Sequence, residues 1–169
     1  MRYASIDIGT NTLRLLVAEL DNDGLRPVFY KRKITRLGGG YDEVTGISME
    51  AAERTFAALK EFRRHMDDAG VSTVMAFATS VVRRAKNSAW FTEEVRKKTG
   101  IEITVIHGGE EARLSLMGVL SVIDERQGKK LVIDVGGGST EFIATIGPEM
   151  AGGWSMELGV VHLTEKYLN

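Results

Sequence analysis

One pattern occurs twice in this chain and constrains its fold more than any other feature. Residues 5–14 read SIDIGTNTLR and residues 132–141 read VIDVGGGSTE. Each copy has an apolar strand, an aspartate near its end, a glycine, a turn of small polar residues and the start of a second strand. Because glycine lets the backbone curl, several N–H groups in each turn can point at one spot. The pattern therefore predicts two strand-turn-strand units, each able to bind an anion.

The residue types in the two turns suit phosphate. Backbone, hydroxyl and amide donors come from Gly9, Thr10, Asn11, Thr12, Gly136, Gly137, Gly138, Ser139 and Thr140. Asp7 and Asp134 offer carboxylates to a divalent cation that bridges phosphate oxygens, as magnesium does, usually through water. A tight hairpin without a ligand is the alternative for either copy alone, and the repetition argues against it. A dinucleotide fingerprint does not fit, because a strand rather than a helix follows the glycines.

Hydrophobic periodicity outlines the other elements. Strands are expected over residues 3–8, 13–20, 25–35, 71–78, 101–106, 131–135, 140–146 and 150–156, and helices over 48–70, 88–100, 110–123 and 158–168. This order predicts an α/β fold with a mixed sheet flanked by helices. Apolar residues surround the helix over 110–123, so burial on most of its sides is expected. The run Lys31-Arg32-Lys33 is typical of a solvated edge strand.

The polar stretch over residues 124–130 is the predicted boundary between two lobes. Residues 1–124 are expected to form a first lobe, and residues 125–169 the incomplete start of a second. The strands of the second lobe lack following helices to cover them, and a hairpin of that size does not build a stable core alone. We therefore expect this segment to be poorly ordered or paired with another copy.

Composition excludes several classes of site. The chain has no cysteine, which rules out disulfides and thiolate zinc sites and leads us to expect a cytoplasmic location. A net charge of -1 gives no electrostatic reason for DNA or an anionic membrane as partner. No apolar run approaches the roughly 20 residues that a transmembrane helix needs. His65, His107 and His162 lack the spacing of metal ligands.

Five motifs point to one family. DIGTN at 7–11 and DVGGGSTE at 134–141 resemble the phosphate loops of the sugar kinase / heat-shock protein / actin superfold, which is ribonuclease H-like. Arg36-Leu37-Gly38, the segment 79–85 and GEEARL at 109–114 narrow the likeness. Together the motifs resemble the exopolyphosphatase / guanosine pentaphosphate phosphohydrolase family, in order and over nearly the whole chain. The glutamate pair is the most specific piece, because the glycine loops alone would also fit kinases.

The resemblance implies a magnesium-dependent phosphatase. Family members release the terminal phosphate from inorganic polyphosphate or from guanosine pentaphosphate, in a cleft between two actin-like lobes. In this chain the resemblance implies a truncated second lobe, so it does not establish whether the chain is active by itself. It also implies a homodimer in the full-length form. Two alternatives remain: a metabolite kinase of the same superfold, and a non-catalytic actin-like protein that binds nucleotide or phosphate.

The resemblance also assigns roles to side chains. Glu111, the second glutamate of the pair, is the base that activates water, with Glu110 as the runner-up. Glu141 matches a position near the reacting phosphate, and Arg83 matches an arginine that points into the cleft. Asp7 and Asp134 are the expected Mg²⁺ ligands, while Arg14 and Arg36 are weaker candidates for phosphate contacts.

Overall fold

The computed structural model of the protein describes residues 1–22, 24–124 and 127–168. The chain forms two compact units, a first unit over Met1–Val105 and a second unit over Ile106–Asn169. In chain order its elements are β1 (Arg2–Ile8), β2 (Thr12–Asp21), β3 (Gly24–Ile34), α1 (Met49–Asp68), β4 (Thr73–Ala78), α2 (Ser80–Arg84), α3 (Ser88–Thr99), β5 (Ile103–Val105), α4 (Gly108–Val122), β6 (Lys129–Val135), β7 (Thr140–Ile146), β8 (Glu149–Met156) and α5 (Val160–Tyr167).

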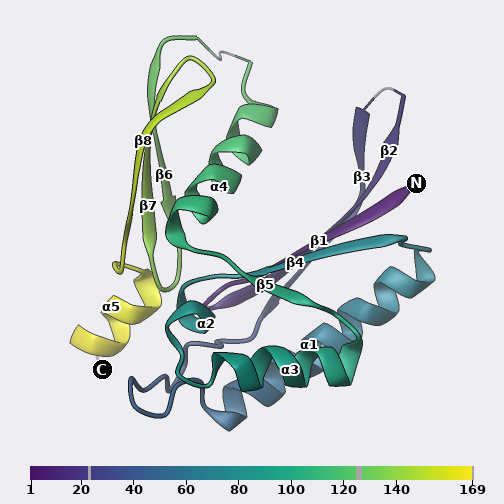
Figure 1. The fold of residues 1–169 in the computed structure, drawn as a ribbon, viewed down its shortest axis with the longest axis vertical. Helices are drawn as coiled ribbons and strands as arrows, with labels where there is room; N and C mark the ends of the chain where they lie inside the picture. Colours follow the sequence, from purple (N-terminus) through teal and green to yellow (C-terminus); the bar gives the residue numbers. More distant parts are fainter. Residues whose placement is uncertain (23, 125–126, 169) are drawn as a thin grey trace. The chain divides into compact units, whose positions relative to one another are not determined.

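The first unit is built on a five-stranded mixed sheet, as predicted (Figure 1). Its strand order is β3-β2-β1-β4-β5. The first three strands form an antiparallel meander, while β4 pairs parallel to β1 and β5 parallel to β4. β3 lies at the edge, where Lys31, Arg32 and Lys33 are exposed, and Lys33 Nζ lies 2.9 Å from a carboxylate oxygen of Glu61 on α1.

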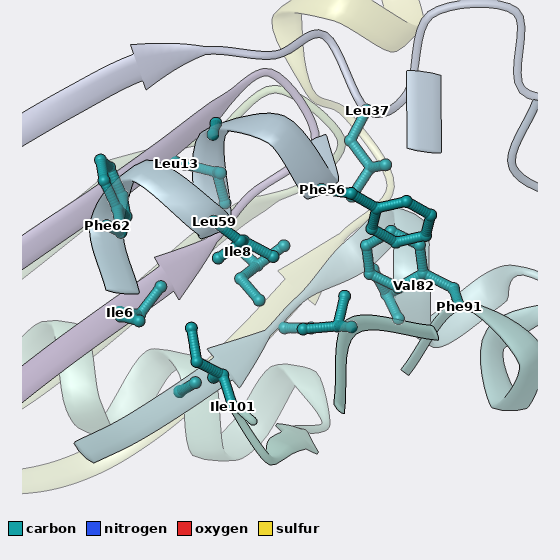
Figure 2. Packing of buried hydrophobic residues seen from close by; sticks show 14 of the residues in the cluster. Ile6, Ile8, Leu13, Leu37, Phe56, Leu59, Phe62, Val82, Phe91 and Ile101 are labelled. Carbon is teal, nitrogen blue, oxygen red and sulfur yellow. The ribbon is translucent and has the colours of Figure 1, made fainter. Parts of the chain in front are cut away.

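Helices α1 and α3 build the core of the first unit against this sheet. Ser48 caps α1 as expected, since its hydroxyl accepts a hydrogen bond from the N–H of Ala51. Figure 2 shows Ile6 and Ile8 of β1 among the aromatic side chains of the helices, where Phe56 stacks on Phe91 with ring centroids 5.5 Å apart. Side chains alternate along a strand, so Asp7 points to the sheet face opposite this core.

The helix α2 was not expected from the sequence. It has only five residues, too few for a helical period to show, and isolated helices of this length are not stable. Burial holds it in place, because Val81 and Val82 are completely enclosed in the core of the first unit. Arg83 and Arg84 occupy its last turn. Tertiary packing, rather than local preference, therefore positions these two arginines.

The second unit contains a three-stranded antiparallel sheet of order β6-β7-β8. Contrary to expectation, a helix does cover it: α4, which precedes the strands in sequence, packs on one face through Ala112 and Leu116 against Ile143 and Val132. That expectation was wrong because it was based only on helices that follow the strands in sequence. As a division between the lobes of a longer protein, the boundary predicted near Asp124 stays a prediction.

Apolar side chains are exposed in two places of the second unit: on α4, where the sequence suggested burial, and on the sheet. In α4 only Ala112 and Leu116 are buried, while Met117 and Val122 are exposed, so the helix is not buried on most sides. On the sheet, the exposed apolar residues are Leu131, Ile133, Val135, Ile146, Met150, Trp154 and Met156. Whether another copy pairs with this segment stays a prediction. None of the described helices is both long and apolar enough to cross a membrane.

Candidate functional site

The first loop, residues 9–12, is a tight turn between β1 and β2. The N–H of Gly9 donates to the carbonyl oxygen of Thr12 at 3.1 Å, and a Cβ on Gly9 would lie only 3.1 Å from that oxygen. Thr10 is buried, and its hydroxyl has no hydrogen-bond partner in the described part of the chain. A buried hydroxyl without a partner costs free energy, so this group is suited to a ligand or a water molecule.

Asp7 lies one residue before the end of β1, opposite Arg14 of β2. An Nη1 of Arg14 lies 2.6 Å from Oδ2 of Asp7. Partial burial of the guanidinium lowers the pKa of Arg14, but the hydrogen bonds and charge interactions with Asp7 and, to a smaller extent, with Tyr30 together outweigh this effect and raise the pKa overall. Arg14 therefore stays charged and neutralises Asp7 beside the first loop.

A second turn, residues 35–38, fixes the carbonyl groups of the first loop. The N–H of Gly38 donates to the carbonyl of Thr10 at 2.7 Å, and the N–H groups of Thr35 and Arg36 both donate to that of Asn11 at 3.0 Å. A Cβ on Gly38 would lie 2.4 Å from the Thr10 methyl carbon, which explains the glycine. The run of glycines over 38–40 therefore begins in an anchored turn.

Arg54 of α1 also binds the 35–38 turn, through side-chain hydrogen bonds to two of its carbonyl groups. Its Nε donates to the carbonyl of Thr35 at 3.0 Å and its Nη2 to the carbonyl of Arg36 at 3.2 Å. Arg36 has a φ of 48°, the left-handed region that non-glycine residues rarely adopt. Such a conformation persists where surrounding contacts hold it. The guanidinium of Arg54 supplies two of those contacts.

The second loop, residues 136–139, repeats the geometry of the first. The N–H of Gly136 donates to the carbonyl oxygen of Ser139 at 2.9 Å, in the same arrangement as Gly9 and Thr12. A Cβ on Gly136 would lie 2.9 Å from that oxygen, so only glycine fits. Thr140, at the start of β7, donates its hydroxyl proton to the carbonyl of Leu158 at 2.6 Å. That hydroxyl is therefore engaged within the protein.

The first turn of α5 binds the carbonyl groups of the second loop. The N–H of Val160 donates to the carbonyl of Gly136 at 3.0 Å, and the N–H of Val161 to that of Gly137 at 2.9 Å. Gly159 allows this approach, because a Cβ there would lie 2.2 Å from backbone atoms of Gly137. Helix N-termini leave N–H groups without partners inside the helix, and here the loop carbonyls satisfy them.

These carbonyl bonds determine where the loop N–H groups point. In a planar trans peptide, the N–H of one residue points opposite to the carbonyl of the residue before it. Because the carbonyls of Gly136 and Gly137 face α5, the N–H groups of Gly137 and Gly138 point away from that helix. In the first loop, the carbonyl of Thr10 faces Gly38, so the N–H of Asn11 points away from the 35–38 turn. Each loop thus presents backbone donors, as an anion site requires.

Two carboxylates lie side by side next to the second loop. Asp134, one residue before the end of β6, pairs across the strands with Glu141 of β7. Glu141 is only 1% exposed, and Oε1 of its carboxylate accepts a hydrogen bond of 2.7 Å from the hydroxyl of Ser155 on β8. Oδ2 of Asp134 accepts one of 2.5 Å from the hydroxyl of Ser115 on α4. Both carboxylates are therefore held by hydroxyl donors.

The glutamate pair lies in the first turn of α4. His107 caps this helix, since its Nδ1 accepts a hydrogen bond from the N–H of Glu110 at 3.2 Å. The guanidinium of Arg113 donates hydrogen bonds to both carboxylate oxygens of Glu110, at 2.8 Å from Nε and 2.7 Å from Nη2. This hydrogen bond, followed by the charges of Arg113 and His107, lowers the pKa of Glu110 despite some desolvation. Glu110 is thus a bound, weakly basic carboxylate.

The predicted site residues fall into two groups. Asp7, the first loop and Arg83 belong to the first unit, while Glu111, Glu141, Asp134 and the second loop belong to the second. Sequence reasoning missed the supporting residues Ser115, Ser155, Gly159, Arg54 and His107. A signal existed for Ser155 alone: once the register of the β7–β8 hairpin is known, strand alternation places it opposite Glu141. His107 caps its own helix, but histidine is not among the residues that usually mark a helix N-cap. The contacts of the remaining three residues join segments distant in sequence.

Comparisons with known proteins agree on one family. A model of the Ppx/GppA phosphatase family matches residues 16–169. The chain is 37% identical, over 97% of its length, to a bifunctional 3-dehydroquinate synthase/phosphatase of Fusobacterium nucleatum. It is 34% identical over 99% to exopolyphosphatase 1 of Mycobacterium tuberculosis, and 33% identical over 98% to a guanosine-5'-triphosphate,3'-diphosphate pyrophosphatase of Aliivibrio fischeri. The aligned parts make up 26%, 49% and 33% of these proteins, so the chain spans at most about half their length.

Solved structures agree with this relationship. An exopolyphosphatase from Cytophaga hutchinsonii matches with a TM-score of 0.95 and 33% identity, covering 99% of this chain and 54% of that one. MreB5 of Spiroplasma citri, at a TM-score of 0.50 and 16% identity over 99% of this chain and 56% of that one, is similar in fold alone. The predicted actin-like fold is thus confirmed. One conclusion follows from the paired loops, the glutamate pair on α4, the fold and the family match: the chain belongs to the Ppx/GppA phosphatase family.

Proposed function

We propose that this chain carries the phosphate-binding and catalytic residues of a magnesium-dependent phosphoanhydride hydrolase. Its substrate is inorganic polyphosphate or guanosine pentaphosphate, and its product is the terminal phosphate. The main support for the proposal is the pair of matching loops. In each loop, backbone carbonyls accept hydrogen bonds from a neighbouring segment, so loop N–H groups point away from that segment. The names of the relatives support both substrates equally, because one is an exopolyphosphatase and another a guanosine nucleotide pyrophosphatase.

In this proposal the loops bind phosphate oxygens through the N–H groups of Asn11, Gly137 and Gly138. The orphaned hydroxyl of Thr10 adds a donor. Arg83 contributes a planar guanidinium, which suits a phosphate because its N–H groups bind two oxygens at once. Preorganised donors favour hydrolysis, because phosphoryl transfer depends on charge stabilisation more than on covalent help from the protein.

The carboxylates fit magnesium as part of a substrate complex. The described residues contain no group of three His, Cys, Asp or Glu side chains that could hold a metal. Magnesium, however, is usually bound by one or two carboxylates together with waters and substrate phosphates. Asp7 and Asp134, each near the end of a strand before a loop, are the residues that would hold it. The ion would neutralise phosphate charge, and Glu141 would orient the ion or the attacking water.

Glu111 is the proposed general base. Its first-turn position on α4 lets the helix dipole stabilise a carboxylate near phosphate. Glu110 is the poorer candidate, because Arg113 binds both its oxygens and lowers its pKa. A base with a lowered pKa takes up a proton less readily.

The test replaces each glutamate by glutamine in the natural polypeptide that contains this chain. Phosphate release is measured with magnesium, using long-chain polyphosphate and guanosine pentaphosphate as substrates. Glu111→Gln should lower turnover by about 10²–10⁴-fold, the usual contribution of a general base, with substrate affinity unchanged or higher. Glu110→Gln should have a much smaller effect.

Other outcomes would identify an alternative. Loss of turnover in Glu110→Gln alone would reverse the assignment of the base. Full activity in both variants would remove the main chemical support for a phosphatase. Phosphate transfer only in the presence of an acceptor would indicate a metabolite kinase, and binding of nucleotide or polyphosphate without turnover would indicate a non-catalytic binding protein.

Three further expectations accompany this function. A homodimer of the full-length protein and a cytoplasmic location are predictions, and sedimentation velocity and fluorescent tagging can test them. DNA is not an expected partner, because the net charge of -1 gives no attraction to a polyanion.

A further inference from the structure

The two loops differ at one position that matters electrostatically. Across the strands, Asp7 faces the cation Arg14, whereas Asp134 faces the carboxylate Glu141. Like charges placed directly opposite in a sheet destabilise it. The second unit therefore needs another way to hold this pair of carboxylates.

Two seryl hydroxyls meet this need. Ser155 of β8 donates to Oε1 of Glu141 at 2.7 Å, and Ser115 of α4 donates to Oδ2 of Asp134 at 2.5 Å. Glu141 depends on its donor more strongly, since its side chain is almost completely buried while Asp134 is only half-buried. A buried carboxylate must be hydrogen-bonded to remain charged at low cost.

Ser155 also lies against the helix that carries the proposed base. A Cβ on Gly108, the first residue of α4, would lie 2.5 Å from Cβ and 2.7 Å from Oγ of Ser155. The backbone of the first helical turn thus rests on this side chain, and Glu111 is in the same turn. One serine therefore contacts Glu141 through its hydroxyl and supports the start of α4 through its packing.

We propose that Ser155 is a positioning residue for catalysis: it fixes the carboxylate of Glu141 relative to the first turn of α4, which carries Glu111. The proposal rests on the proposed function, in which Glu141 orients the magnesium ion or the attacking water. Ser155 itself does not touch the substrate. Its effect should therefore appear in turnover and disappear when Glu141 is absent.

The kinetic test uses Ser155→Ala in the natural polypeptide, with Ser121→Ala as the matched control. The hydroxyl of Ser121, in the same unit, donates to the carbonyl of Gly118 in its own helix and lies on an exposed side. Loss of a residue that orients a catalytic group typically costs about 10–100-fold, so Ser155→Ala should lower kcat by about tenfold with KM nearly unchanged. Ser121→Ala should retain the parent kcat.

A double-mutant cycle separates positioning from general damage. If Ser155 acts through Glu141, then Ser155→Ala should add no further loss of turnover to Glu141→Ala. If the two losses multiply, or if Ser155→Ala alone keeps the parent kcat, the proposal is wrong. A rise in KM equal to the fall in kcat/KM would also contradict it, because that would indicate damage to substrate binding.

A crystal structure of Ser155→Ala gives a readout that needs no activity. The carboxylate of Glu141 should leave its present orientation, while the backbone of the second loop stays in place. If Glu141 keeps its orientation without the hydroxyl, Ser155 does not position it. If the parent protein releases no phosphate from either substrate, the proposed function fails, and this structure alone decides whether Ser155 holds Glu141.

Discussion

Replacing Gly159 by alanine should disrupt the second loop without touching its sequence. Gly159 has φ -88° and ψ 152°, an extended conformation that alanine adopts freely, so the substitution introduces no backbone strain. The added Cβ, however, would lie 2.2 Å from the carbonyl carbon and oxygen of Gly137 and from the nitrogen of Gly138. These are backbone atoms and cannot swing aside. Helix α5 and the loop must therefore move apart.

The structure sets the size of the effect. Real Cβ contacts essentially never fall below 3.0 Å, so the gap must widen from 2.2 Å to at least that value. This displacement would lengthen the bonds from Val160 and Val161 to the loop carbonyls, now 3.0 and 2.9 Å. Overpacking of this kind costs about 1–3 kcal/mol of folding free energy. Loss of one loop hydrogen bond to a charged phosphate costs about 1.5–3 kcal/mol, at least about tenfold in affinity.

The assay combines urea unfolding with calorimetric binding of tripolyphosphate in magnesium. Gly118→Ala is the matched control, because Gly118 lies inside α4 and a Cβ there would meet no atom within 4 Å. It should increase the free energy of unfolding by up to about 1 kcal/mol, since alanine favours the helix over glycine. If Gly159→Ala retains the stability and affinity of the parent, α5 does not set the loop geometry.

Three further outcomes are expected. Phe56→Ala should lower the free energy of unfolding by about 3–5 kcal/mol in a urea titration, because this ring is buried and packs against Trp90 and Phe91 of α3. Arg54→Ala should speed amide hydrogen exchange in the 35–38 turn, which loses two side-chain hydrogen bonds. Hydrogen bonds from the backbone N–H groups of Thr45 and Val44 lower the pKa of Asp42. The ionised carboxylate should therefore stabilise the fold above about pH 4, and this contribution should be lost as the pH falls through the lowered pKa of Asp42. Asp42→Asn should abolish this pH dependence when the free energy of unfolding is measured against pH.

The repeated pattern was enough to locate both loops and both aspartates. This succeeded because the constraint is local: Gly9 and Gly136 each close a turn that a Cβ would crowd, and each aspartate lies one residue before the end of its strand. Local chemistry of this kind is visible in residue identity. The roles assigned to the side chains around the loops, by contrast, remain predictions.

The contacts that orient the loops could not be predicted. The carbonyl of Thr10 is bound from Gly38, and the carbonyl of Gly136 from Val160. A backbone carbonyl carries no side-chain signal, so no pattern indicates which distant N–H will bind it. The same limit explains the error about the second sheet. α4 precedes the strands that it covers, and hydrophobic periodicity does not show which neighbour an apolar face will meet.

The difference between the two loops has a consequence for the proposed chemistry. Beside the first loop, the charge of Asp7 is balanced by Arg14 at 2.6 Å. Beside the second, Asp134 and Glu141 are both acidic, and their donors are neutral serines that hold a carboxylate without cancelling its charge. In the proposed complex, a phosphate at the second loop would experience repulsion that backbone N–H groups alone offset poorly. A divalent cation would offset it, so the proposed requirement for magnesium originates mainly in the second unit rather than in both loops equally.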